Sequence, residues 1–435
     1  MRVGGPNGAV LRMPGPWERN LYVLWVAQAA SAMGFSFFFP FVPLFIQDLG
    51  VEDPGRAALW SGIAGGAGGL FMMVSGPIWG FLGDRYGLKK NILRSLFGSA
   101  LVLGLTGLVT DVYQLVAFRM VLGLVSGTWV TIMALVSASA PKGRVSYGIG
   151  VVLSASFVGF TIGPFIGGLL ADSVGYRLTF FVTGALCTFA GLMVLLFVRE
   201  SFQRPREVEK LRPRLVFENF AQSIRLPGLA PVLLVLLLVQ VGPTIMMPVL
   251  PVFIGTLSAS GSAASSAGIA FSIMGGAGAL SSVVTSRLAR RFGIGPVMTV
   301  AFVGGGLLYL PLLFVGSLAP VFVITGFMGF FNGGLNTLAF GLVGSTVPKD
   351  KQGAAYGVAQ SASSLAWGGG PLVGGAIAGM WGLREVFLVN SIALFATAVL
   401  AARLFRKRPV ETEAREAESA VADLESAPSA ANGGD

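Results

Sequence analysis

The sequence predicts an all-α membrane protein with twelve transmembrane helices in two pseudo-symmetric six-helix bundles. Three observations predict this architecture: the composition, a series of apolar segments and an internal repeat. Of the 435 residues, 54 % are hydrophobic and only 11 % are charged, with a mean hydropathy of +0.77. Soluble domains carry about 25 % charged residues and a membrane span needs roughly 20 apolar ones, so there is room for about a dozen spans. No polar stretch is long enough to fold as a soluble catalytic domain, so we do not expect an enzyme.

The expected spans are apolar segments bounded by charged or turn-forming residues. The first six cover residues 20–47, 57–83, 92–110, 112–140, 147–171 and 176–199. The second six cover residues 229–255, 264–287, 295–316, 318–346, 353–379 and 383–405. The first segment lacks the short apolar core and small-residue cleavage site of a secretory signal, so we expect it to remain as a span.

Charge divides the connections between the spans into two alternating sets. One set, with the termini and the middle segment, holds nearly all of the 30 Lys and Arg residues. The other set holds only Arg56, Arg177 and Arg384. The positive-inside rule places the first set and both termini in the cytoplasm. The net charge of +10 is thus explained by the lipid bilayer and does not indicate a nucleic-acid partner.

These boundaries divide the chain into five parts. They are a cytoplasmic N-terminus (1–19), an N-terminal six-helix bundle (20–199), a cytoplasmic linker with an amphipathic helix (200–228), a C-terminal six-helix bundle (229–405) and a disordered, acidic cytoplasmic tail (406–435).

The two bundles repeat each other in sequence. Residues 40–46 (PFVPLFI) match 248–254 (PVLPVFI), and residues 163–168 (GPFIGG) match 370–375 (GPLVGG). Because each half has an even number of spans, both halves start in the cytoplasm and are related by an axis along the membrane normal. We expect a cavity at the midplane where the halves meet, which suits transport by alternating access.

The connection between the second and third spans carries a motif, because residues 80–90 read GFLGDRYGLKK. Glycines permit a tight turn and close helix approach, and a carboxylate at a helix edge can accept hydrogen bonds from a neighbouring helix N-terminus. The motif resembles the cytoplasmic signature of the major facilitator superfamily, except that Leu88 stands where the family usually has Arg. The resemblance implies a cytoplasmic gate that loosens on protonation and is formed by Gly80, Asp84, Arg85, Gly87 and Lys89. The corresponding residues 286–293 (SRLARRFG) keep the basic residues but lack the acid.

Arg119 is the only charged residue well inside an expected span. A cation at that depth is costly unless it faces a cavity or a partner. Residues 119–127 (RMVLGLVSG) resemble the fourth-helix motif of the same superfamily, with Leu122 in place of the usual Gln. The resemblance implies that Arg119 takes part in proton transfer. The alternative is a side chain that extends to the outer interface.

The fifth span contains the most informative pattern. Glycines at near-helical spacing allow close packing, and a proline within a helix permits a bend, so together they form a pivot and a seal. The pattern resembles the antiporter motif of the superfamily and implies its twelve-span drug:proton antiporter branch. Its residues are Gly150, Gly159, Gly163, Pro164, Gly167 and Gly168.

The resemblance implies a cavity lined mainly by spans one, four, seven and ten, helped by spans two, five, eight and eleven. Aromatic and methionine side chains with scattered amides indicate an adaptable pocket, although each of them can equally serve helix packing. The expected cavity residues are Gln28, Ser31, Phe35, Trp129, Met133, Gln240, Thr244, Met247, Asn332, Asn336 and Trp367.

No Asp or Glu lies deep in an expected span, so we expect neutral, zwitterionic or anionic amphipathic substrates. The chain has no His and one Cys, Cys187, which argues against a metal site. The resemblance implies transport that needs no cofactor and is driven by the proton gradient.

We therefore expect a proton-driven exporter of small amphipathic compounds in a prokaryotic cell membrane, working as a monomer. A proton-coupled importer of an organic solute and a non-transporting membrane sensor are the alternatives.

Overall fold

The computed structural model describes residues 16–141, 143–200, 229–258, 261–346 and 352–406. Within these ranges the chain is helical and contains no strand. The expected amphipathic helix of the linker and the expected disordered tail lie outside the described residues.

The N-terminal half contains α1 (Pro16–Phe37), α2 (Val42–Asp48), α3 (Pro54–Tyr86), α4 (Leu88–Thr106), α5 (Val112–Val125), α6 (Thr128–Ser139), α7 (Val145–Val174) and α8 (Tyr176–Phe197). The C-terminal half contains α10 (Leu229–Met246), α11 (Leu250–Leu257), α12 (Ala263–Phe292), α13 (Ile294–Tyr309), the 3₁₀ helix η1 (Pro311–Leu313), α14 (Leu318–Thr346), α15 (Gln352–Trp381) and α16 (Leu383–Arg406).

The lengths and apolar character of these helices fit a membrane. Nine helical segments of the described chain are long and apolar enough to cross a bilayer, or ten if α1 and α2, which meet at a bend of 44°, form one span. The helices α4 and α15 complete two sets of six, because α4 packs against α8 and α15 packs against α3 and α10. The expected twelve-helix architecture is confirmed.

Three expected spans are broken near their middle or outer part. The first and seventh break at equivalent Pro-rich segments, between α1 and α2 and between α10 and α11. The fourth breaks at Gly127, whose φ of +127° favours glycine. Arg94 stabilises this break: its Nη1 donates to the carbonyl oxygen of Val125 (2.8 Å) and its guanidinium lies 3.4 Å from the ring centre of Trp79. The cation therefore compensates a carbonyl that the broken helix leaves unpaired.

Carboxylates at the outer ends cap helices. The Oδ1 of Asp53 accepts a hydrogen bond from the backbone N–H of Arg56 (2.7 Å) at the start of α3. The Oδ1 of Asp111 accepts one from the N–H of Gln114 (2.9 Å) at the start of α5. These acids stabilise the first turn, where backbone N–H groups have no partner within the helix.

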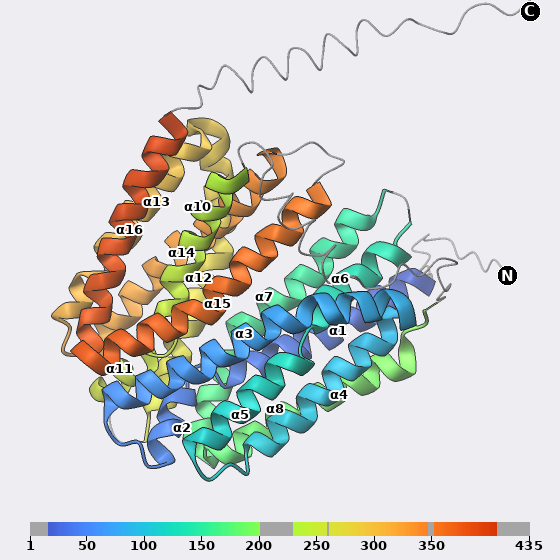
Figure 1. Cartoon of the computed structure of the whole chain (residues 1–435), viewed down its shortest axis with the longest axis horizontal. Coiled ribbons are helices and arrows are strands. Elements are labelled where there is room, and N and C mark those ends of the chain that lie inside the picture. The colour runs from blue at the N-terminus through green and yellow to red at the C-terminus, as the bar shows by residue number, and fades with distance from the viewer. Residues whose placement is uncertain (1–15, 142, 201–228, 259–260, 347–351, 407–435) are drawn as a thin grey trace, which may run out of the picture.

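The two halves touch through two helix pairs, α3 with α15 and α7 with α12. Figure 1 shows the bundles converging near α2 and α11 and diverging toward the opposite end. A Cβ at Gly55 would lie 2.9 Å from the carbonyl oxygen of Ala378, whereas a Cβ at Gly76 or Gly80 would meet nothing within 4 Å. The structure is therefore closed on the outer side and open on the cytoplasmic side.

Helix α7 packs closely against α1 within the N-terminal half. Ser36 Oγ donates to the carbonyl oxygen of Gly159 (2.9 Å). A Cβ at Gly159 would lie 2.6 Å from Ala32 Cβ and 2.7 Å from the backbone nitrogen of Met33. By contrast, a Cβ at Gly150 in the same helix would meet nothing within 4 Å.

This difference predicts that replacing glycine with alanine will affect stability differently at the two positions. Gly159→Ala should destabilise the protein relative to Gly150→Ala by about 1–3 kcal/mol, because the added methyl group overpacks the contact with α1. Both variants gain the same helix propensity, so Gly150→Ala is the matched control. Thermal unfolding of the two purified variants in one detergent checks the prediction, and equal midpoints would contradict it.

Candidate functional site

The loop between α3 and α4 forms a tight turn at the cytoplasmic end of the N-terminal half. Gly87 ends α3 and precedes α4 with a φ of +106°. Lys89 Nζ donates to the carbonyl oxygens of Leu195 (2.9 Å) and Val198 (2.7 Å), so this cation binds the end of α8 in its own half. The two carboxylate oxygens of Glu200 accept the N–H groups of Leu88 and Lys89 (both 2.9 Å). The loop is thus fastened to the N-terminal bundle.

The other residues expected at the gate lie at the end of α3. Asp84 is in its last turn, but the Asp84 side chain lies outside what the structure describes. The Arg85 guanidinium lies 5.4 Å from the ring centre of Tyr86. Gly80 has open space where a side chain would begin. This end of α3 is therefore not in tight contact at Gly80, as expected for an open cytoplasmic side.

Arg119 is buried within the N-terminal half, with 8 % of its surface exposed. Its guanidinium lies 4.0 Å from the ring centre of Phe38, in the segment between α1 and α2. The Nη2 has no hydrogen-bond partner, and no carboxylate pairs with Arg119 among the described residues. The structure thus places this cation against an aromatic ring inside the bundle and does not place it at the outer interface.

The glycines of α7 face two different neighbours. Gly159, Gly163 and Gly167 lie against α1. Gly168 lies against the first residues of α12, and the Pro164 carbonyl lies against Gly268 of the same helix. Helix α7 therefore connects the interior of its own half to the partner half, which is the position that a pivot requires.

Some of the expected cavity residues lie between helices instead. Gln28 is 4 % exposed, and its Nε2 donates to Ser156 Oγ (3.0 Å) on α7. Thr244 is 3 % exposed, lies against Gly370, and donates to the carbonyl oxygen of Gln240 (2.9 Å). Met133 is partly buried against the core of the N-terminal half. The side chain of Gln28 therefore bonds to a neighbouring helix, and the hydroxyl of Thr244 bonds within its own helix.

The remaining expected cavity residues are more accessible. Trp129 and Trp367 are exposed. The half-buried members are Ser31, Phe35, Gln240, Met247, Asn332 and Asn336. Asn336 Nδ2 donates weakly to the carbonyl oxygen of Asn332 (3.4 Å), one turn earlier in α14.

An aromatic cluster bridges the two halves. The ring of Phe39 lies 6.5 Å from Phe160 on α7 and 6.3 Å from Trp367 on α15. Phe39 also contacts Phe35 and Phe38 edge to face. The same Phe38 ring covers Arg119, so the aromatic cluster and the buried cation are neighbours.

A carboxylate that the motif analysis did not select joins the halves on the outer side. Asp172 lies in the last turn of α7 and is half-buried. Its Oδ1 accepts the N–H of Ala264 (3.2 Å) and its Oδ2 accepts the N–H of Ser265 (2.7 Å). Asp172 therefore caps the N-terminus of α12 in the opposite half, where the helix dipole favours negative charge.

A second internal repeat identifies this residue in the sequence. Residues 168–175 (GLLADSVG) repeat residues 80–87 (GFLGDRYG), with Asp172 in the place of Asp84. The glycines that end the two segments have similar conformations, with φ of +106° at Gly87 and +88° at Gly175. The same motif thus occurs at both membrane faces of the N-terminal half.

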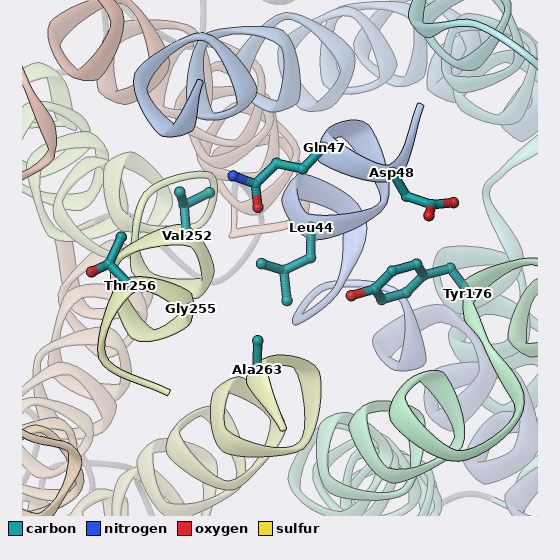
Figure 2. A pocket seen from close by; sticks show the side chains of 8 residues that line it. All are labelled: Leu44, Gln47, Asp48, Tyr176, Val252, Gly255, Thr256 and Ala263. Atoms are coloured by element: carbon teal, nitrogen blue, oxygen red, sulfur yellow. The ribbon is translucent and has the colours of Figure 1, made fainter. Parts of the chain in front are cut away.

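A vestibule lies on the outer side between the halves. It has a volume of about 370 Å³. Figure 2 shows Asp48 and Tyr176 of the N-terminal half on one side and Val252 and Thr256 of the C-terminal half on the other. Ala263, which precedes the two residues whose N–H groups bind Asp172, also lines it. The vestibule thus reaches to within one residue of this cap.

Comparison with known proteins gives the family. The sequence profile of the Major Facilitator Superfamily matches residues 24–368 and 316–429. The chain is 31 % identical over 385 residues to the multidrug resistance protein MdtG of Enterobacter lignolyticus (strain SCF1), covering 88 % of this chain and 91 % of that protein. It is 30 % identical over 392 residues to a multi-drug resistance efflux pump PmrA homolog of Lactococcus lactis subsp. lactis (strain IL1403), covering 90 % and 96 %.

Solved structures share the fold. A bacterial homologue of the human lysosomal transporter Spinster, in an inward-facing and unoccupied conformation, has a TM-score of 0.67 at 16 % identity, covering 91 % of this chain and 98 % of that chain. A POT family transporter in complex with 5-aminolevulinic acid has a TM-score of 0.72 at 13 % identity, covering 88 % and 95 %. The chain therefore belongs to the major facilitator superfamily and is a multi-pass membrane transporter.

Proposed function

We propose that this transporter exports small amphipathic compounds from the cytoplasm in exchange for protons, by alternating access. The names of the relatives, a multidrug resistance protein and a multi-drug efflux pump homolog, support export of drug-like compounds. The antiporter motif in α7 supports exchange, because its glycines and proline lie between the two halves. The observation that carries the coupling is the contact of Asp172 with the N-terminus of α12.

The outer contact is sensitive to protonation. A charged carboxylate accepts both N–H groups and is stabilised by the positive end of α12, an interaction worth about 0.3–1 kcal/mol and up to about 2 kcal/mol when partly buried. A proton that reaches Asp172 from the outer side removes the charge and weakens the contact. Proton binding at Asp172 thus favours opening toward the outside.

Asp84 is the corresponding carboxylate on the cytoplasmic side. It lies at the end of α3, whose partner in the other half is α15. When the cytoplasmic ends close, Asp84 would meet the N-terminal end of α15 as Asp172 meets that of α12. The two carboxylates would then act in alternation, each holding one side closed.

The interior favours substrates without a positive charge. Arg119 has no carboxylate partner among the described residues, and its neighbour Phe38 belongs to an aromatic cluster. An aromatic surface next to an uncompensated cation suits neutral or anionic amphipaths, whereas a permanent cation would be repelled.

Asp172→Asn should open the outer side. With spin labels at Val174 and Thr256, which are both exposed at the outer ends of opposite halves, the wild type should show a short distance distribution. The variant should gain a longer population, enriched up to roughly tenfold, because it loses the charge on the helix cap. Replacing buried Cys187, the only cysteine, gives the background for labelling. Asp111→Asn, which alters a cap within one half, is the matched control.

Acidification should act on the wild type as Asp172→Asn does. The carboxylate stabilises the closed outer side only while it is ionised, so lowering the pH should lengthen the label distance in the wild type and leave Asp172→Asn unchanged. Asp48 is another carboxylate that lines the outer vestibule, so Asp48→Asn is the control in this experiment. Equal responses of the wild type and Asp172→Asn would contradict the role of Asp172.

Asp84→Asn should abolish proton coupling. In inside-out vesicles with an acidic interior, addition of a transported amphipath should release protons through the wild type and not through the variant. Neutral, anionic and cationic compounds should be compared, and Asp111→Asn should behave as the wild type. If no compound releases protons from vesicles that contain folded protein, the exporter is rejected, and solute uptake or a sensor role becomes the better reading.

A further inference from the structure

A second cavity lies between the halves on the cytoplasmic side. It has a volume of about 540 Å³ and is lined by Phe157 of α7, Thr337 of α14 and five residues of α12, namely Ser282, Val283, Ser286, Arg287 and Arg290. We call it the basic pocket. Two guanidinium groups at one cavity with apolar walls suit a ligand that joins a negative charge to an apolar body.

The basic pocket lies where α7 and α12 separate. Toward the outer side the two helices touch: Gly168 contacts the start of α12, and the N–H of Phe165 donates to Ser272 Oγ (3.0 Å). Nearer the cytoplasm, Gly275 still approaches Thr161, with its Cβ position 3.3 Å from Thr161 Oγ1. One turn beyond Thr161 the contact gives way to the pocket at Phe157. The pocket therefore occupies the gap that the open cytoplasmic side creates.

The arginines are the donors that remain for a ligand. Ser282 Oγ donates to the carbonyl oxygen of Ala279 (2.7 Å), Ser286 Oγ to that of Ser282 (2.7 Å), and Thr337 Oγ1 to that of Gly333 (3.1 Å). These hydroxyl hydrogens are thus used within their own helices. Arg287 and Arg290 are exposed and have no hydrogen bond or ion pair among the described residues.

The internal repeat shows that the two halves differ in charge at this position. When Gly293 is aligned with Gly87, Arg290 stands at the position of Asp84. The second half thus carries a cation where the first half carries the gate carboxylate. A cation cannot cap a helix N-terminus, because the helix dipole repels it there. Arg290 therefore cannot serve as a helix cap in the manner proposed for Asp84.

Two apolar side chains line the pocket beside its polar groups. Phe157 and Val283 are 53 % and 52 % exposed, and they lie on α7 and α12 respectively. Their large exposed surfaces can cover the apolar part of a ligand whose charge meets the arginines. A small inorganic anion would leave this apolar surface uncovered.

We infer that the basic pocket binds the anionic group of an amphipath, a sulfonate, carboxylate or phosphate on an apolar body, through Arg287 and Arg290. The inference deepens the proposed function by assigning the site where such a substrate first meets the protein. Because the pocket spans α7 and α12, closing the cytoplasmic side would narrow it and displace the ligand. An amphipathic substrate and an anionic lipid share this chemistry, and the experiment separates them.

The test measures binding to the purified full-length protein in phosphatidylcholine nanodiscs. The probes are anilinonaphthalene sulfonate and phenylnaphthylamine, which share an aromatic skeleton and differ in the sulfonate. Arg287→Gln and Arg290→Gln should each raise the dissociation constant of the sulfonate roughly tenfold, the loss expected for a charge-assisted hydrogen bond. The neutral probe should change by less than about twofold, which also reports that the variants are folded.

Arg291→Gln is the matched control, because Arg291 is exposed on the same helix but lies over Phe292, outside the pocket. Unchanged sulfonate binding in the two pocket variants would overturn the inference. An equal loss in Arg291→Gln would also overturn it, because the effect would then come from general surface charge. Probe binding is measured without a proton gradient, so it does not depend on transport. If the vesicle experiment shows no proton exchange, the proposed export is rejected, but the measured binding of the sulfonate to the basic pocket still holds.

A second experiment, in which the lipid composition is changed, tests whether the ligand of the basic pocket is a bilayer lipid or another amphipath. Replacing part of the phosphatidylcholine with phosphatidylglycerol should weaken sulfonate binding to the wild type more than to Arg290→Gln if lipid headgroups occupy the pocket. If both proteins respond equally, the site is reserved for amphipaths that are not bilayer lipids.

Discussion

Backbone-to-backbone contact between paired helices holds the two halves together, and the other features of the structure depend on it. Gly62 of α3 lies directly against Pro371 of α15, and Gly268 of α12 lies directly against Pro164 of α7. Inside a membrane, small residues allow such approach, and van der Waals packing replaces the hydrophobic effect as the attractive force. Because these contacts lie toward the outer side, the cytoplasmic ends of the two halves diverge. The contacts thereby determine the shapes of both the outer vestibule and the basic pocket.

Asp172 adds a charged group to this contact between the halves. Glycine packing alone does not respond to protons, whereas a carboxylate that caps a helix of the other half links the packing to a charge. The turn that presents it, ending at Gly175, repeats the turn that ends at Gly87 at the other membrane face. One local motif therefore occurs at both ends of the N-terminal half. In the proposed cycle, each copy would hold its own membrane face closed.

The sequence predicted the helices well because bilayer thickness imposes a length and an apolar character on each span. It predicted helix ends less well: α3 runs from Pro54 to Tyr86, beyond the expected 57–83, because helices continue past the apolar core. Gln28 and Thr244 were expected at the cavity and lie between helices, since polarity alone does not distinguish a ligand contact from a helix contact. The motif analysis did not select Asp172, because its partner is a helix N-terminus in the other half. The repeat of residues 80–87 at 168–175 is the signal that marks its position.

The distribution of charge between the halves follows from these roles. Aligning Gly382 with Gly175 puts Gly379 at the position of Asp172, just as Arg290 stands at that of Asp84, so both gate acids belong to the N-terminal half. A carboxylate beside Arg287 would neutralise it or repel an anionic ligand. At these two repeat positions the second half carries Arg290 and Gly379, so neither position places a carboxylate there. In the proposed cycle, the two halves would therefore divide proton binding and anion binding between them, without placing opposing charges at one site.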